Sequence, residues 1–95
     1  MKITKVVLKN KEDNKMKAIA TVTLDGSFVV TGIRLIQGDE KMFVAMPSRK
    51  VAEGVFDEVA HPINKETRQM FEEVIYKAYE EMKASGEDII KIEFE

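Results

Sequence analysis

Two runs of alternating residues joined by Asp25-Gly26 constrain the fold of this chain more than any other feature. In "MKAIATVTL", residues 16–24, every second residue from Met16 is apolar, as a strand with one buried face requires. Asp-Gly tolerates positive φ at both central positions of a type I′ turn, and "SFVVTGIRLIQ", residues 27–37, returns on its far side. These features predict a β-hairpin, with a bend at Gly32, where glycine interrupts a β-branched run.

Shorter apolar segments on either side of this hairpin predict further strands. "KITKVVL" predicts a strand over residues 2–8, and the polar "KNKEDNK" after it predicts a loop over residues 9–15. After a second turn, "MFVAM" predicts a short strand over residues 42–46. We expect that strand to end at Pro47, because proline has no N–H to donate to a neighbouring strand.

The region after Pro47 predicts a loop, an extended piece and one helix. Residues 48–50 fall in the loop, and "VFDEVAHPI" predicts an extended piece that ends at His61-Pro62, since the residue before proline avoids the helical region. The helix is expected over residues 65–84, with Asn64 as N-cap and Ser85-Gly86 as its end. Its apolar residues recur at helical spacing: Met70, Phe71, Val74, Ile75, Ala78, Tyr79 and Met82.

The last residues, 87–95, form an extension after the helix. "IIKIEFE" alternates apolar and charged residues, which predicts a final strand or an ordered amphipathic segment. Taken with the sheet expected within residues 1–60, this indicates one small domain over residues 1–95. The predicted fold class is α+β: an antiparallel β-sheet of four to five strands followed by one main C-terminal helix.

Length and composition favour a small globular protein that gains stability from a second copy. A domain of 95 residues buries a limited core, so dimerisation would add useful burial. The chain has no cysteine, which removes disulfides, thiolate catalysis and sulfur-ligated zinc. The start "MKITKVVLKNK" lacks the apolar core of a signal peptide, and no apolar run is long enough to span a membrane. We therefore expect a cytoplasmic homodimer that does not interact with a membrane.

Charge is distributed unevenly along the chain. Residues 1–52 hold ten Lys and Arg against five Asp and Glu, whereas residues 53–95 hold five against twelve. The net charge of −2 is a poor signature of a nucleic-acid binder, but this asymmetry would fit a basic sheet face beside an acidic helix. A mixed, solvated surface explains the same counts equally well.

Motifs for enzyme chemistry are weak in this sequence. His61 is the only histidine, so a hydrolytic relay would need it, with Ser48 as nucleophile and Asp57 as orienting group; no G-x-S-x-G motif supports that arrangement. One imidazole and scattered carboxylates match no metal-ligand spacing, and no glycine-rich phosphate loop is present. We expect no enzyme activity, no cofactor, no metal and no small-molecule substrate, and a structural role for His61.

The adjacent cations Arg49 and Lys50 are the best functional clue from the residues themselves. Arginine binds phosphate through two hydrogen bonds and lysine acts as a mobile point charge, so a loop that carries both can reach a nucleic-acid backbone. Arg34 and Arg68 are the further residues expected at this site, with Lys17 and Lys65 as neighbours. An ordinary solvated loop would account for the pair too, but two-fold symmetry would duplicate the cations on one duplex.

The stretch "FVAMPSRK", continued by "GVFDEVAHPIN" and "TR", closely resembles the SpoVG family, the stage V sporulation protein G or septation regulators of bacteria. The resemblance extends from "KITKVVL" to the helix, and the tail after Gly86 diverges. It implies a small dimer with an antiparallel sheet and helical structure, which binds DNA and in some members RNA, without enzyme activity. The family's basic pair falls on Arg49 and Lys50; its order here is Arg-Lys where other members often have Lys-Arg.

These observations lead to two functional hypotheses. The first is a homodimeric regulator that binds duplex DNA or RNA through Arg49, Lys50, Arg34 and Arg68 and affects septation, sporulation and cell-surface genes. The second is a non-catalytic protein-interaction module with partners at the division septum. For the dimer, the segment ending at Pro47 and the tail residues 90–94 are candidates for strand pairing between subunits.

Overall fold

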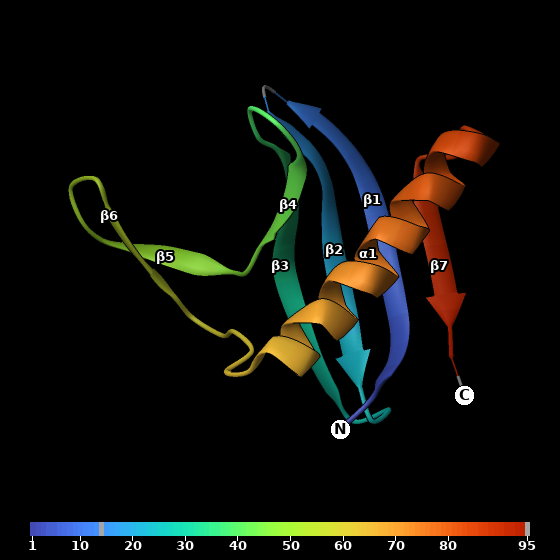
Figure 1. Ribbon diagram of the computed structural model, residues 1–95, viewed down its shortest axis with the longest axis horizontal. Helices are drawn as coiled ribbons and strands as arrows, with labels where there is room; N and C mark the ends of the chain where they lie inside the picture. The colour runs from blue at the N-terminus through green and yellow to red at the C-terminus, as the bar shows by residue number, and fades with distance from the viewer. Residues whose placement is uncertain (14, 95) are drawn as a thin grey trace.

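A curved five-stranded antiparallel sheet with one helix across one face forms the body of the protein in the computed structural model, which describes residues 1–13 and 15–94 (Figure 1). The five strands are β1 (Ile3–Asp13), β2 (Met16–Leu24), β3 (Phe28–Gln37), β4 (Met42–Ala45) and β7 (Ile89–Glu93). They lie in the order β4-β3-β2-β1-β7. The helix α1 spans Lys65–Ser85, and β5 (Ser48–Ala52) pairs with β6 (Val55–Glu58) in a separate hairpin. The predicted α+β class is confirmed.

The central hairpin forms as its residues predict. β2 and β3 pair antiparallel, and the Ser27 N–H donates to the Leu24 carbonyl at 2.9 Å to close the turn. Asp25 and Gly26 both have positive φ, 52° and 62°, which is the type I′ geometry. Gly32 has φ of 76° and lies where the β2–β3 register shifts, so the expected bend is a bulge.

The first strand is longer than its sequence indicates. β1 continues to Asp13, so the prediction of a polar loop was wrong for residues 9–13. Backbone pairing explains the difference, because Lys9 faces Ile19 and Asn10 faces Ala18 across β2, and ladder hydrogen bonds do not require apolar side chains. Asn14 of the predicted loop lies outside the described residues.

The C-terminal extension is a strand of the same sheet. β7 pairs antiparallel with β1, with Val6 opposite Ile92 and Leu8 opposite Ile90. The tail therefore finds its partner within the chain, while its outer edge and that of β4 remain the two edges of the sheet. Glu95 of the predicted extension lies outside the described residues.

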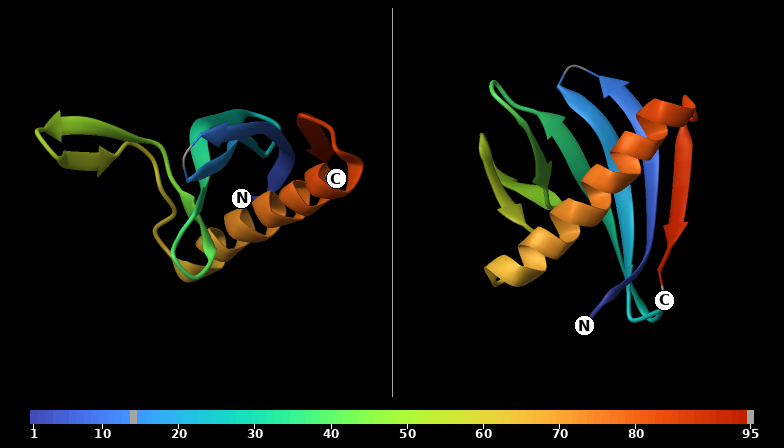
Figure 2. Two further views of the ribbon diagram at one scale, coloured as in Figure 1. Left: turned by 90° about the horizontal axis from the view of Figure 1, so that it is seen from above. Right: turned by 45° about the vertical axis from the view of Figure 1, so that its right-hand side comes forward.

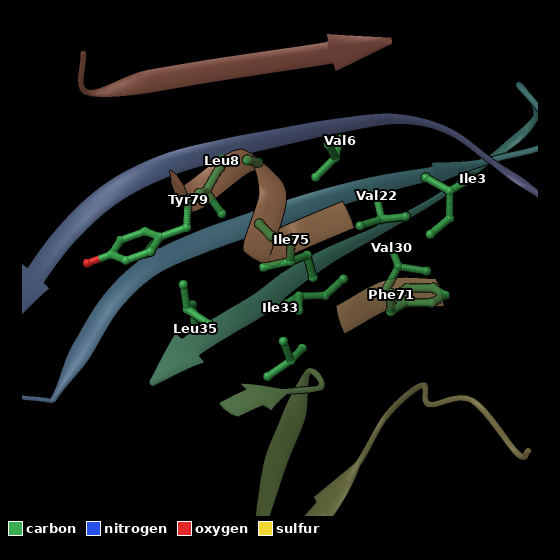
Figure 3. Packing of buried hydrophobic residues seen from close by; sticks show 14 of the residues in the cluster. Ile3, Val6, Leu8, Val22, Val30, Ile33, Leu35, Phe71, Ile75 and Tyr79 are labelled. Atoms are coloured by element: carbon green, nitrogen blue, oxygen red, sulfur yellow. The ribbon is translucent and has the colours of Figure 1, made fainter. Parts of the chain in front are cut away.

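Alternation along the strands places one set of side chains under the helix and the other on the opposite surface of the sheet, which we call the open face. In Figure 2 the helix crosses only one side of the sheet. The helix contributes Phe71, Ile75 and Tyr79 to the core, and the strands contribute residues such as Val6 and Ile33 (Figure 3). This packing holds the sheet rigid behind its open face.

Specific caps fix the ends of α1. The Asn64 side chain accepts a 2.8 Å hydrogen bond from the Thr67 N–H, as an N-cap should. At the other end Gly86 adopts the left-handed conformation, and its N–H donates to the Met82 carbonyl at 2.9 Å. The predicted helix limits are therefore confirmed within one residue.

Candidate functional site

Arg49 and Lys50 lie on a projecting β-hairpin, not in a loop. They belong to β5, where Arg49 faces Asp57 and Lys50 faces Phe56 across β6. The expectation of a flexible loop was wrong, because the residues on both sides of Glu53-Gly54 pair with one another and Gly54 supplies the positive φ of the turn. This hairpin, residues 48–58, extends away from the sheet beside β3 and β4 (Figure 1).

The charges on the hairpin are mixed. Arg49 and Lys50 are accompanied by three carboxylates, those of Glu53, Asp57 and Glu58. Lys50 Nζ lies 3.2 Å from Glu53 Oε2, and the two side chains are 51% and 95% exposed. A pair as exposed as this is worth about 0–1 kcal/mol, so Lys50 can exchange Glu53 for another anion at little cost.

Arg34 is joined to the base of the hairpin. Its Nη2 donates a 3.3 Å hydrogen bond to Ser48 Oγ, one residue before Arg49. A surface cavity lies at this corner between sheet and hairpin, lined by Gly32, Arg34, Pro47, Ser48 and Phe56. The structure thus brings Arg34 to the hairpin that carries Arg49 and Lys50.

Arg68 belongs to a different part of the surface. It lies in the first turns of α1, half-buried, and its N–H donates to the Asn64 carbonyl at 3.2 Å. The helix that carries Arg68 packs mainly on β1 and β7. The predicted set of four is therefore divided between the hairpin corner and the helix.

Apolar side chains are unusually exposed along the hairpin and the segment that follows it. Phe56 and Val59 are 63% and 66% exposed, and Val51 and Val55 are nearly half exposed. A two-stranded hairpin is marginally stable on its own in water, and these side chains add no core to this one. These apolar side chains of the hairpin therefore lie exposed to solvent in the single chain.

The residues considered for hydrolysis do not form a relay. His61 Nδ1 lies 3.4 Å from Glu58 Oε1, and Ser48 Oγ accepts from Arg34. Within residues 1–13 and 15–94 there is no group of three or more His, Cys, Asp or Glu that could hold a metal ion. No helix in this same part of the chain has the length and apolar character needed to cross a membrane.

The open face of the sheet carries cations from four strands. Of these cations, the sequence analysis singled out only Lys17 and Arg34. By strand register, the cations on this face include Lys5, Lys9, Lys17, Arg34 and Lys91, and the carboxylate of Glu93 lies opposite Lys5. The helix is close to neutral, with four basic and five acidic residues. The cations on this face thus outnumber the Glu93 carboxylate, whereas the charges of the helix nearly balance.

Sequence reasoning missed Lys5, Lys9 and Lys91. Alternation in "IIKIE" could have placed Lys91 opposite the core, and Lys9 follows the buried Leu8 in the same way. Alternation would put Lys5 on the side of the buried Ile3, and only the register shift between these two residues moves Lys5 to the open face. Only the order of strands shows that these separate alternations share one surface.

Comparison with known proteins gives a consistent result over most of the chain. The SpoVG family model matches residues 1–81. Over 65 residues, or 67% of this chain, it is 52% identical to a protein of Listeria monocytogenes serotype 4b named "Putative septation protein SpoVG 1", and the match spans 64% of that relative. Relatives named "Putative septation protein SpoVG" from Thermoanaerobacter sp. strain X514 and Clostridioides difficile strain 630 are 54% and 55% identical over the same length, which is 71% of each.

Proposed function

Because the chain belongs to the SpoVG family, we propose that it is a homodimeric regulator in the cytoplasm that binds nucleic acid and affects septation, sporulation and cell-surface gene expression. It acts by binding and not by catalysis, and it needs no cofactor. Nucleic-acid phosphates are the ligand, on duplex DNA and also on RNA. Arg49 and Lys50 make the leading contacts, with support from Arg34 and Arg68.

The observation that carries this proposal is the projecting hairpin with its two adjacent cations. Strand pairing holds Arg49 and Lys50 away from the sheet, where a nucleic-acid backbone can approach without meeting the rest of the protein. The Arg34–Ser48 hydrogen bond anchors the base of the hairpin and keeps a third cation near it. Such an arm needs no positive net charge on the whole chain.

The exposed apolar residues of the hairpin support the dimer. A second copy that packs on Val51, Val55, Phe56 and Val59 would bury side chains that have no cover in the monomer. Two-fold symmetry then presents two Arg49-Lys50 pairs together. The free edges of β4 and β7 offer a further route for pairing between subunits.

The test is fluorescence anisotropy with pooled duplex DNA and pooled single-stranded RNA across a salt series. With about four to six phosphate contacts in a dimer, affinity for duplex DNA falls with a slope near −0.9 per contact in log–log form. Arg49→Ala/Lys50→Ala should weaken binding and flatten that slope. Lys41→Ala/Lys83→Ala removes the same charge from exposed positions elsewhere and should leave binding close to wild type.

Light scattering on each variant shows whether the dimer persists, so that loss of binding is not confused with loss of assembly. A wild-type protein that binds neither pool at low salt would overturn the proposal. Binding that the hairpin variant retains in full would overturn the assignment to Arg49 and Lys50.

A protein-interaction module at the septum is the second candidate function, and the composition of the hairpin favours it. The hairpin carries more carboxylates than cations and exposes apolar side chains, which suits a protein surface as partner. Association that is insensitive to salt, together with no nucleic-acid binding, would select this candidate.

A further inference from the structure

A group of cations lies on the open face of the sheet, apart from the Arg49-Lys50 pair of the hairpin. Lys5, Lys9, Lys17, Arg34 and Lys91 project from this face, and the carboxylate of Glu93 lies opposite Lys5 across β1 and β7. Among the described residues, none of these five cations has a carboxylate oxygen within 4.0 Å. A rigid surface with this excess of positive charge attracts an anionic polymer.

The strand register sets the spacing of these charges. Lys9 faces Ile19, which in turn faces Arg34, so the two cations are two strand spacings apart, about 10 Å. Lys5 and Lys9 lie on the same strand four residues apart, about 13 Å. The cations therefore form a two-dimensional array across β1, β2 and β3, which a flexible polymer can follow in more than one direction.

Apolar side chains fill the spaces between the charges. Val7, Ile19 and Ile36 are half-buried on this face, and Phe43, opposite Ile36 at the β4 edge, is 43% exposed. A duplex presents mainly phosphate and sugar to such a surface and gains little from apolar groups. The unstacked bases of a single strand can lie against them while its phosphates meet the cations.

We propose that the open face binds single-stranded nucleic acid, with Lys9, Lys17 and Arg34 on its phosphates and Phe43 against a base. The inference rests on the proposed nucleic-acid binding and adds a second surface to it. Arg34 belongs to both surfaces, since its guanidinium also reaches Ser48 at the base of the hairpin. A strand that crosses the sheet at Arg34 can thus continue toward Arg49.

The test is anisotropy with labelled oligothymidylate and oligouridylate, and with a mixed-sequence duplex of equal strand length. Lys9→Gln/Lys17→Gln should lower single-strand affinity roughly tenfold at low salt and reduce the salt slope by about 0.7 per lost contact. Phe43→Ala should lower single-strand affinity roughly fivefold or more and leave the salt slope unchanged, because stacking releases no counterions. Neither change should weaken duplex binding to the same degree.

Lys77→Gln/Lys83→Gln is the matched control, since it removes two exposed lysines of α1, which crosses the other face of the sheet. An equal loss of single-strand affinity in this control would overturn the proposal, because the effect would then be one of net charge. Circular dichroism and melting temperature show that each variant is folded, and Lys9→Arg/Lys17→Arg should restore affinity. A folded Lys9→Arg/Lys17→Arg variant that still binds single strands as weakly as the glutamine variant would also overturn the proposal.

The outcome for this surface is separable from that for the hairpin. If the wild type binds single strands and only Arg49→Ala/Lys50→Ala loses them, the open face is not the site and the proposed function stands. If Lys9→Gln/Lys17→Gln loses single strands while the hairpin variant keeps them, the open face is the site. A wild type that binds no nucleic acid overturns both.

Discussion

Arg34 and Ser48 are joined by a 3.3 Å hydrogen bond from Nη2 to Oγ, which links β3 to the start of the projecting hairpin. Pro47 separates Ser48 from β4 and provides no N–H, so side-chain contacts contribute to the setting of the hairpin at this corner. The direction in which Arg49 and Lys50 are presented therefore depends on a residue of β3 that is distant in sequence.

Removal of either partner in this hydrogen bond should loosen the hairpin. Arg34→Ala and Ser48→Ala should each lower the free energy of unfolding by about 1 kcal/mol, and the double variant should lose less than the sum. Urea unfolding of the four proteins gives this double-mutant cycle. Strictly additive losses would show that the hydrogen bond contributes nothing to stability.

A bulge at Gly32 should be sensitive to any side chain with a Cβ. Its φ of 76° favours glycine, and a Cβ there would lie 3.6 Å from the Pro47 Cβ, an ordinary contact. The cost of Gly32→Ala is therefore conformational, about 1–2 kcal/mol of unfolding free energy. Gly32→Asn should cost less, because asparagine tolerates this region better. Equal costs in thermal unfolding would point to crowding instead.

The N-cap of the helix should contribute measurably to stability. Asn64→Ala removes the acceptor of the 2.8 Å hydrogen bond from the Thr67 N–H and should cost about 1 kcal/mol. Asn64→Asp is the matched control, since its carboxylate can accept the same bond near the positive end of the helix dipole. Chemical denaturation of both variants checks this, and a loss equal to that of alanine in the aspartate variant would contradict it.

Truncation in the core should have a larger effect than truncation beside the hairpin. Ile75 is fully buried between helix and sheet, so Ile75→Ala should lower the free energy of unfolding by about 2–5 kcal/mol. Ile63 is 88% exposed, and Ile63→Ala should change the free energy of unfolding by no more than about 0.5 kcal/mol. A large loss for Ile63→Ala that depends on protein concentration would show that Ile63 lies in an interface between two copies of the chain.

The central hairpin and the helix could be predicted because their signals are local. Alternation around Asp25-Gly26 and the cap at Asn64 depend on neighbours a few residues away. The pairing of β7 with β1 depends on contacts between segments far apart in sequence, which local patterns do not encode. The hairpin that carries Arg49 is local, but Glu53-Gly54 is a weaker turn signal than Asp25-Gly26. A strand of polar residues such as Lys9 and Asn10 is also difficult to predict, because strand pairing uses backbone groups and does not require an apolar pattern.

The candidate site was predicted in part for the same reason. Arg49 and Lys50 are adjacent in sequence, so their proximity needs no fold. The open-face lysines lie on β1, β2 and β7, and only the sheet order brings them together. The sequence shows Arg34 as a candidate cation, but it does not predict the hydrogen bond from Arg34 to Ser48.

Tyr76 should make stability fall at alkaline pH. Its hydroxyl donates a 3.1 Å hydrogen bond to the Met42 carbonyl, and burial, with a smaller effect from Glu72, raises the pKa of the phenol. A raised pKa means that the unfolded chain loses this proton first, near pH 10, so unfolding is favoured as pH rises from there through the folded pKa. Below pH 10 the contribution is fully present.

Tyr76→Phe separates this effect from general alkaline unfolding. The variant should be less stable than wild type by about 1 kcal/mol at neutral pH, because the donor to Met42 is lost. That difference in the free energy of unfolding should shrink as the pH rises above about 10. The wild type then loses the stability that depends on the phenol proton, whereas the phenylalanine variant has no phenol to ionise. Urea unfolding of both proteins between neutral and alkaline pH measures the gap, and a gap that stays constant would show that Tyr76 does not link stability to pH.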